Sequence, residues 1–324
     1  VPYITTPSDL DISYNERTRV MTFRMVCLTI GLLGAGVAAP ALVASGSRAS
    51  YSLMAILLGM LMFVAAIVAL ISIKGLGKFM TSEGKDDTKV HLGLVAGIKF
   101  AWADRNFRFL VLSYLFTGAT THLFLAAVPF FAEYVFGSAK ITSVFMGAFL
   151  VPALISTPIW LKVSLRIGKQ RGLLICQLTF LLGTLALLLG PVIGLAPTVL
   201  IVVVLGSAFG GLQLFAFSMV PDVARAASPD GSMAGSYTGV WTATEATGTA
   251  FGPYIYAAVI GLGGFVAVTA GQEVVQTPTA QAALLLGFTV VPAVLMFIAL
   301  IFQRKYKLDQ ALSSQVGEQA AAAQ

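Results

Sequence analysis

The chain has 324 residues, of which 57% are hydrophobic and only 10% are charged. A soluble domain usually carries about 25% charged residues, so this composition excludes a soluble globular protein. The net charge is +6 at pH 7, yet the basic residues gather in short connections between apolar runs. This placement is typical of membrane topology and indicates no nucleic-acid partner.

Apolar runs long enough to cross a bilayer as helices recur along the chain, which predicts an all-α polytopic membrane protein. Eight spans are predicted: 21–44, 51–73, 109–136, 141–162, 172–190, 196–220, 233–262 and 279–302. If the connections alternate between two sides, one side receives all 20 basic residues except Arg48 and Lys140. The positive-inside rule makes that side cytoplasmic, so both ends are predicted to be cytoplasmic and lipid surrounds the spans. The expected location is the cell (inner) membrane.

The first span carries Arg24 about one turn inside its start. A long basic side chain at that depth can extend back to the membrane interface. It can equally point into a central cavity, so both interpretations stand. Cys27 lies in the same span and Cys176 in the fifth, and both are expected to be buried thiols without a disulfide.

The longest polar stretch, from Lys74 to Arg108, follows the second span. It mixes charges of both signs, contains glycine breaks and ends in an expected short amphipathic helix before the third span. It is the internal boundary of the chain.

The third span contains the sequence GATTHLFLAAVPFF, in which Thr121 and His122 lie near mid-membrane. A single histidine at this depth can hydrogen-bond a neighbouring helix, or it can take part in an ion, proton or cavity path. Both residues are candidates for the second role.

The sixth span places Gly206, Gly210, Gln213 and Phe217 on one helical face. Gln213 is therefore a candidate for a cavity wall. An interhelical hydrogen bond is an equally good account of a glutamine in a span.

The seventh span carries a full charge, Glu245, which costs at least a few kcal/mol in lipid and so should face protein or water. Trp241 and Glu245 share a helical face with Gly248 and Gly252, and Thr242 lies beside them. The GxxxG spacing of the two glycines predicts close packing against another helix. This span is expected to pack tightly on one side and to present polar groups to a solute.

No enzyme signature is present: the chain has no Walker motif, no HExxH, no GxSxG, no metal-ligand spacing and no dinucleotide fingerprint. The expectation is a protein that is not an enzyme and has no cofactor or metal. Without a Walker motif, transport driven by an ion gradient is favoured over transport driven by ATP.

Several phrases together resemble the glycoside–pentoside–hexuronide:cation symporter family, the relatives of melibiose permease in the major facilitator superfamily. They are VPY near the start, SYNERTR with TFR, DRNFRF, RIGKQR, GGLQ followed by MVPDV, and GSYTGVWTATEATGTAFGP. Each phrase is weak alone, but their order and spacing hold across nearly the whole chain.

The resemblance implies that the chain covers helices five to twelve of a twelve-helix protein, with the first four outside it. Residues 1–80 would then hold helices five and six, 81–108 a central cytoplasmic loop, 109–303 the second six-helix bundle, and 304–324 a cytoplasmic tail. In this fold two bundles rock around a central site and give alternating access.

The resemblance also implies a sugar site on three helices. Its matching positions are Arg24, Gln213, Trp241, Thr242 and Glu245. Many relatives carry a lysine just after the position of Glu245, whereas this chain has Ala246. The acidic cation-binding residues of the family lie on helices outside this chain, so the coupling ion is left open between Na⁺ and H⁺.

The leading hypothesis is secondary active transport of a sugar, glycoside or similar small solute. One alternative keeps the transporter and changes the solute to a lipid-like or aromatic compound. A second alternative is a truncated membrane fragment that does not transport.

Overall fold

The computed structural model describes residues 14–42, 48–76, 94–138, 141–228, 233–267 and 275–307. Within these ranges the chain forms helices joined by short turns. The elements are α2 (Tyr14–Leu42), α3 (Arg48–Leu76), α4 (Leu94–Ala103), α5 (Arg105–Phe136), α6 (Ile141–Ile167), α7 (Lys169–Ala186), η1 (Leu187–Leu189), α8 (Gly190–Ile193), α9 (Leu195–Ala227), α10 (Ala234–Leu262) and α11 (Pro278–Gln303).

The predicted spans coincide with long helices, but the count of eight stays a prediction. Within the residues that the structure describes, six helical segments are long and apolar enough to cross a membrane. The six are Arg48–Ile71, Arg105–Phe136, Ile141–Ile167, Lys169–Ile193, Leu195–Ala227 and Pro278–Gln303.

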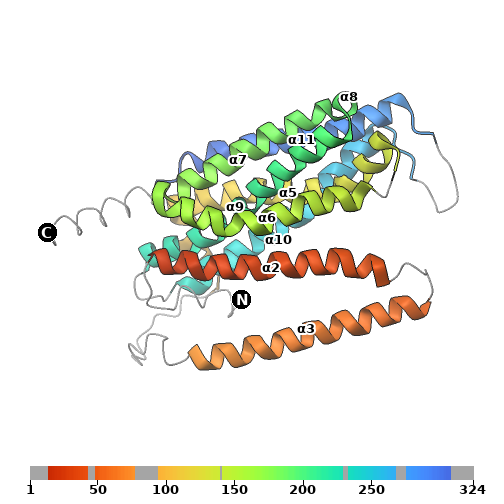
Figure 1. The fold of residues 1–324 in the computed structure, drawn as a ribbon. Helices are drawn as coiled ribbons and strands as arrows, with labels where there is room; N and C mark the ends of the chain where they lie inside the picture. The colour runs from red at the N-terminus through yellow and green to blue at the C-terminus, as the bar shows by residue number, and fades with distance from the viewer. Residues whose placement is uncertain are drawn as a thin grey trace.

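Six helices form one bundle (Figure 1), in which α5 packs against α10 and α11, while α9 packs against α6 and α7. Helix α2 lies along α6 and α9, and α3 lies on the far side of α2. The side of α2 that meets the bundle repeats at helical spacing: Thr18, Met21, Met25 and Thr29 are buried.

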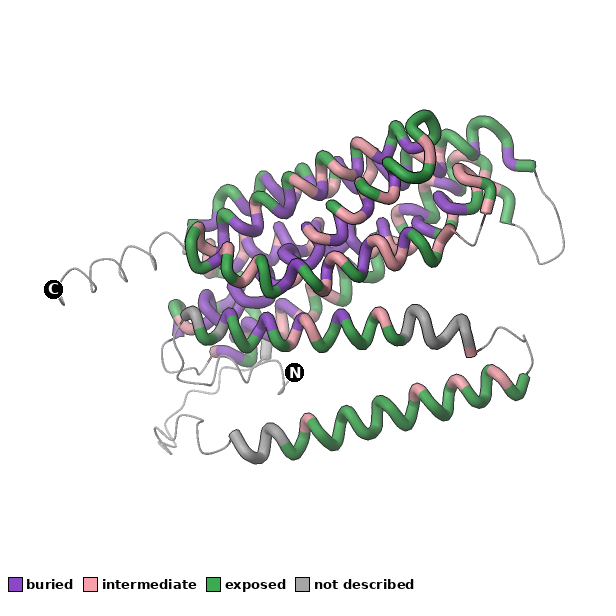
Figure 2. Tube along the Cα trace, in the orientation of Figure 1, coloured by how far each residue is buried: buried purple, intermediate pink, exposed green. Residues whose placement is uncertain are grey.

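Figure 2 shows the contrast between α3 and the bundle: α3 is exposed along nearly its whole length, while the bundle interior is buried. The most apolar stretch of α3 has a mean hydropathy of 2.9 and none of it is buried. Exposed apolar surface on this scale indicates contact with lipid or with another helix.

The bundle interior is filled by aromatic side chains. The ring of Phe288 on α11 stacks on Phe124 and Phe131 of α5, with centroids 4.9 and 4.3 Å apart. Phe149 of α6 meets Phe209 of α9 at 5.0 Å. These contacts fix how α5, α6, α9 and α11 pack, and the polar site lies on one flank of them.

The close packing predicted from the GxxxG spacing is confirmed, and its partner is α5. A Cβ on Gly252 would lie 2.3 Å from the carbonyl oxygen of Ala119, and one on Gly248 would lie 3.1 Å from that of Leu115. Any larger residue at position 252 would push the two helices apart, so these glycines set how closely α10 lies against α5.

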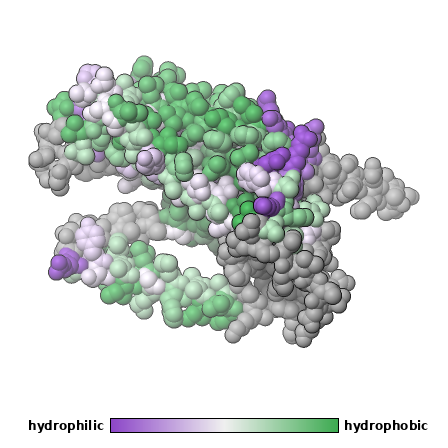
Figure 3. Space-filling view, turned by 180° about the vertical axis from the view of Figure 1, so that it is seen from behind, coloured by the Kyte–Doolittle hydropathy of each residue, from purple (hydrophilic) through white to green (hydrophobic). Residues whose placement is uncertain are grey.

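Figure 3 shows the bundle from behind, with a hydrophobic flank and a hydrophilic cluster at one end. The short helix expected before the third span is observed as α4, and Asp104 then caps α5 by accepting hydrogen bonds from the backbone of Asn106 and Phe107.

The expected loop 81–108 is described only from residue 94, the tail 304–324 only to residue 307, and residues 1–13 lie outside the described ranges.

One expectation for the cysteines is wrong. Cys176 is buried as expected, but Cys27 is exposed. The apolar pattern of α2 does not distinguish its bundle side from its outer side, and Cys27 falls on the outer side.

Candidate functional site

The candidate site lies where α2, α5, α9 and α10 meet. Arg24 of α2 places its guanidinium over the ring of Phe217 on α9, 4.8 Å from the ring centroid. Its other described contact is weak, with one nitrogen 4.0 Å from the sulfur of Met21. A guanidinium has five N–H donors, so most of the donors of Arg24 are free for a ligand.

Three aromatic rings that contact one another line one side of the site. The ring of Tyr114 on α5 stacks on the indole of Trp241 on α10, with centroids 4.2 Å apart and planes at 23°. Phe217 meets both rings edge-on, at 5.6 and 5.5 Å. The ring of Phe217 thus joins this stack to Arg24.

Gln213 is hydrogen-bonded to Tyr114, one member of this stack. The Tyr114 hydroxyl donates a hydrogen bond to the side-chain oxygen of Gln213 over 3.3 Å. The amide oxygen is therefore occupied, which leaves the NH₂ group of Gln213 as the donor that a ligand can use. The alternative of an interhelical hydrogen bond is also observed, between α9 and α5.

Two groups on α10 complete the site. Trp241 is 1% exposed, and among the described residues its indole N–H has no hydrogen-bond partner. Glu245, one turn further, is half-buried, and its carboxylate forms no hydrogen bond or ion pair within the described residues. Buried polar atoms are normally bonded, so the indole N–H of Trp241 stands out, and the half-buried carboxylate of Glu245 lies one turn away from it.

Arg24 and Glu245 lie close enough for their charges to interact. They are not joined by an ion pair within 4.0 Å among the residues that the structure describes. A cation and an anion therefore face the same region from two helices without neutralising each other directly.

The site is closely packed in this structure. A cavity of about 10 Å³ lies between α2, α9 and α10, which is about the space that one water molecule needs. Its lining residues are Met21, Arg24, Phe217, Val220, Pro221, Thr238 and Trp241. A larger solute requires α2 to move away from α9 and α10.

The remaining predicted residues differ in their surroundings. The Thr242 hydroxyl donates to the carbonyl of Thr238 within α10 and is half-buried beside Trp241. Thr121 is buried, with its hydroxyl bonded to the carbonyl of Gly118 in its own helix. His122 is half-buried and contacts Thr249 of α10, two turns along from Trp241. The structure thus groups Arg24, Gln213, Trp241 and Glu245, with Thr242 beside them, and places His122 and Thr121 apart.

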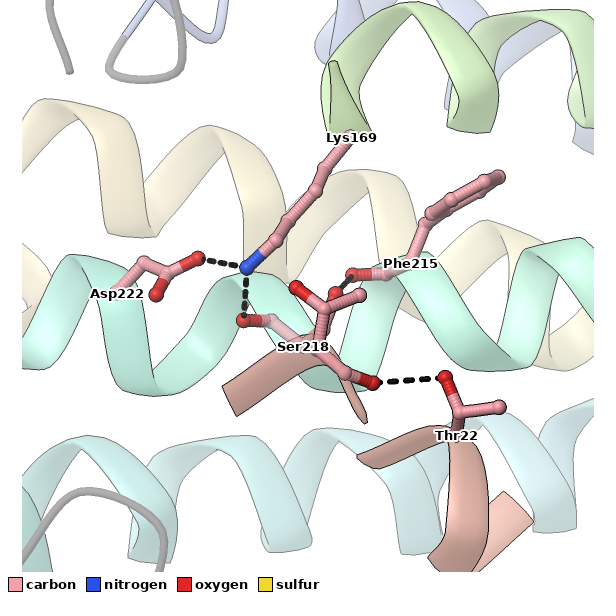
Figure 4. A network of polar contacts seen from close by, with 6 residues as sticks. Thr22, Lys169, Phe215, Ser218 and Asp222 are labelled. Carbon is pink, nitrogen blue, oxygen red and sulfur yellow. Dashed lines mark hydrogen bonds and ion pairs between the residues drawn. The ribbon is translucent and has the colours of Figure 1, made fainter. Parts of the chain in front are cut away.

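A second polar group lies near the ends of α7 and α9. Figure 4 shows Lys169 reaching from the start of α7 to α9, where its ammonium group forms an ion pair with Asp222, at 2.5 Å, and donates to the carbonyl of Ser218, at 3.4 Å. Both charged side chains are almost fully buried, at 1% and 3% exposure. Thr22 of α2 appears in the same view, with its hydroxyl bonded inside its own helix.

Sequence reasoning missed Tyr114 and the Lys169–Asp222 pair. Tyr114 is one of 31 phenylalanines and tyrosines in the chain, so its type alone gives no signal. Its position could have given one, because it lies two turns before His122 and one turn before Thr117 on the same helix. Lys169 lies in the basic stretch RIGKQR, and its charge alone does not indicate a buried partner on another helix.

The comparison with known families agrees with this geometry. The family described as MFS/sugar transport protein matches residues 1–310. The chain therefore belongs to this family of the major facilitator superfamily, and it is a multi-pass membrane protein of the transporter class. The resemblance to the melibiose-permease relatives is consistent with this result. No individually curated protein matches the sequence.

Proposed function

We propose that the protein is a cation-coupled symporter of a sugar, glycoside or similar polyhydroxylated solute, which it moves by alternating access across the cell membrane. The observation that supports this most is the set of free polar groups on three helices. The guanidinium of Arg24, the NH₂ group of Gln213, the N–H of Trp241 and the carboxylate of Glu245 have hydrogen-bonding capacity that the described residues leave unused.

This set suits a polyhydroxylated solute. A hydroxyl group both donates and accepts hydrogen bonds, and the site offers three kinds of donor with one strong acceptor. The three aromatic rings that line the site supply apolar surface for the C–H faces of a sugar ring. A site that hydrogen-bonds hydroxyls rejects analogues that lack them, because its own polar groups are then left unpaired.

The placement of the site also suits alternating access. Arg24 comes from α2, which lies outside the six-helix bundle, whereas Gln213, Trp241 and Glu245 belong to the bundle. A rocking movement of α2 against α9 and α10 would therefore open the small cavity and close it around a solute. The charge pattern favours cytoplasmic ends for this chain.

Replacing Glu245 with glutamine tests the proposal. The variant keeps the shape of the side chain but weakens a charge-assisted hydrogen bond, which is worth about 1.5–3 kcal/mol. We expect a ten- to hundredfold loss of solute affinity. Uptake of radiolabelled monosaccharides, disaccharides and aryl glycosides into proteoliposomes, driven in turn by a Na⁺ gradient and by a H⁺ gradient, is the measurement.

The matched control is Glu133→Gln, because Glu133 is an exposed carboxylate on α5 away from the site. It should leave uptake unchanged. Equal uptake by the two variants, with the same ion dependence, would remove Glu245 from the site. No uptake of any hydroxylated compound by the parent protein would contradict the function itself.

A second candidate solute has support from one observation. A groove of about 600 Å³ lies between α4, α5 and α10, with mainly apolar walls that include Trp102, Leu115 and Val240. An acyl chain or an aromatic ring would fit there. Inhibition of uptake by long-chain alkyl glycosides but not by free sugars would favour a lipid-like solute.

A further inference from the structure

Three basic side chains meet at the end of the bundle where α5 begins and α11 ends. The guanidinium carbons of Arg105 and Arg108 lie 5.8 and 5.9 Å from the centroid of the Phe109 ring. The ammonium nitrogen of Lys305, which follows α11, lies 5.7 Å from the same centroid. An aromatic ring attracts a cation, but three cations around one ring repel one another. The cluster therefore favours the binding of an anion.

The described part of the chain supplies no anion to this cluster. None of the three side chains forms a hydrogen bond or an ion pair with a described residue. The carboxylate nearest in sequence, that of Asp104, is already used. One of its oxygens accepts from the backbone of Asn106 and Phe107, and the other accepts from the hydroxyl of Tyr237. Within the described ranges the three cations thus keep their capacity to bind a ligand.

Contacts between α5 and α11 hold the cluster in place. The backbone N–H of Lys307 donates to the side-chain oxygen of Asn106 over 3.2 Å, and the rings of Phe116 and Phe302 stack with centroids 5.9 Å apart. The positive-inside rule accounts for basic residues on this side of a membrane. It does not account for cations of two helices that converge on one ring, which these contacts explain.

The face of α5 that begins with these cations continues as apolar surface. Arg105, Arg108, Leu112 and Leu115 follow one another at spacings of three and four residues, so they share one face of the helix. Leu112 and Leu115 line the groove of about 600 Å³ between α4, α5 and α10. Sites for small ligands commonly have about 300–1,000 Å³. The cluster thus adjoins a groove with room for a hydrocarbon chain.

The other walls of the groove suit a lipid at the membrane surface. A Cβ on Gly235 or Gly239 of α10 would meet no atom within 4 Å, so the groove is open along that wall. Ile98 and Trp102 of α4 line the opposite wall and are themselves 44% and 43% exposed. Tryptophan is enriched at the level of the lipid headgroups, so the mouth of the groove is expected at that depth.

We propose that Arg105, Arg108 and Lys305 bind the phosphate of an anionic phospholipid, one acyl chain of which lies in the groove between α4, α5 and α10. A guanidinium group matches two oxygens of a phosphate with parallel hydrogen bonds. Anionic lipids give the cytoplasmic leaflet its negative surface potential, and the charge pattern predicts these helix ends on that side. The bound lipid is a component of the bilayer and not the transported solute, so the inference goes beyond the proposed function.

Native mass spectrometry of the full chain, purified in detergent, tests the proposal without requiring transport. The probes are dioleoyl phosphatidylglycerol, which is anionic, and dioleoyl phosphatidylcholine, which has the same acyl chains and no net charge. We expect phosphatidylglycerol to bind about tenfold or more tightly than phosphatidylcholine. Equal affinities for the two lipids would overturn the proposal.

Removing two charges from the cluster tests the headgroup site. In the double variant Arg108→Gln and Lys305→Gln, we expect the affinity for phosphatidylglycerol to fall about ten- to thirtyfold, with no change for phosphatidylcholine. The matched control is Lys162→Gln with Arg166→Gln, which removes two charges from exposed positions at the same predicted side of α6. Equal losses in the two double variants would reduce the effect to net charge and overturn the site.

Gly239→Leu tests the groove, because its side chain would extend into the open space there. We expect it to exclude the acyl chain and to weaken phosphatidylglycerol binding about tenfold. The melting temperature should not fall, since leucine favours a helix more than glycine does. Gly147→Leu on α6 is the control, because a Cβ there also meets open space and the position lies outside the groove. Unchanged lipid binding by Gly239→Leu would contradict the placement of the acyl chain.

A soluble headgroup separates a lipid site from a site for free phosphate esters. Glycerol 1-phosphate carries the phosphate without acyl chains, and we expect it not to displace phosphatidylglycerol. Displacement at similar concentrations of the two compounds would assign the cluster to a soluble phosphate ester and overturn the lipid assignment. Thermal unfolding of every variant in the same detergent identifies a loss of binding that is due to unfolding, and the charge and groove variants test the site independently of each other.

Discussion

Two groups of polar side chains lie among the helices, and they differ in where their partners come from. Lys169 and Asp222 pair with each other, and Lys169 also bonds a backbone carbonyl. Arg24, Trp241 and Glu245 hold donors and an acceptor that the described chain does not use. The first group is complete within the protein, and the second is incomplete.

The difference gives a physical criterion for distinguishing polar groups that stabilise the fold from polar groups that are available to bind a ligand. A buried charge that has its counter-charge stabilises one arrangement of helices, and removing either partner leaves the other uncompensated. A buried polar group without a partner costs free energy in the folded state. Such a group persists where something else supplies the missing hydrogen bond, and under the proposed function a solute does so.

The largest effect is expected from Lys169→Met, which keeps the length of the side chain and removes its charge. Asp222 is then left buried without its counter-charge, which costs about 3–5 kcal/mol. The measurement is the thermal unfolding of the purified protein in detergent. Lys162→Met, at an exposed position on α6, is the control and should lie within about 0.5 kcal/mol of the parent. Equal melting temperatures would place Lys169 outside the stabilising group.

An intermediate effect is expected from two matched tryptophan variants. The indole N–H of Trp160 donates to the carbonyl of Ser207 over 2.8 Å, whereas that of Trp241 has no partner among the described residues. Both changes to phenylalanine remove similar volume, so their difference reports the hydrogen bond. Trp160→Phe should cost about 1 kcal/mol more stability than Trp241→Phe.

Uptake should show the reverse order for these two variants. Trp241→Phe removes a donor from the proposed solute site and should weaken solute affinity, while Trp160→Phe should leave the affinity unchanged. Thermal unfolding and uptake on the same two proteins are the measurements. A larger loss of stability in Trp241→Phe would mean that its N–H has a partner inside the protein after all.

The smallest effect is expected from Tyr114→Phe, which keeps the stack on Trp241 and removes the hydroxyl bonded to Gln213. The amide of Gln213 is then free to turn, so its NH₂ group is less well placed. We expect solute affinity to fall about threefold, with little change in stability. Tyr254→Phe, at an exposed position, is the control, and equal affinities of the two variants would contradict a positioning role for Tyr114.

The sequence predicted most of the candidate site because each of its residues conflicts with its surroundings. A single arginine, glutamine or glutamate in an apolar span has to face protein or water, so Arg24, Gln213 and Glu245 were recognisable one at a time. The structure adds that they lie around one region, where α2, α9 and α10 come together. Their binding roles stay predictions until uptake is measured.

The contacts that sequence reasoning missed depend on which helical faces pack against each other. Periodicity defines a face, but it does not name the face of another helix that will cover it. The stack of Tyr114 on Trp241 joins residues far apart in the chain, and the pairing of Lys169 with Asp222 required knowing that α7 starts beside the end of α9. The GxxxG pair predicted a close neighbour, and only the structure identified it as α5.

The length of α9 has a consequence for the depth of these two groups. With 33 residues and a rise of about 1.5 Å per residue, α9 is about 50 Å long, while the hydrocarbon layer is about 30 Å thick. A tilt of about 20° shortens the projected length only slightly, so one or both ends of α9 stand among the lipid headgroups. Asp222 lies in the last turns of α9, whereas Glu245 lies near the middle of α10. Hydrophobic mismatch should therefore act on them differently, because a thicker or thinner bilayer changes the lipid environment most at the helix ends, near Asp222, and least at the middle of α10, near Glu245.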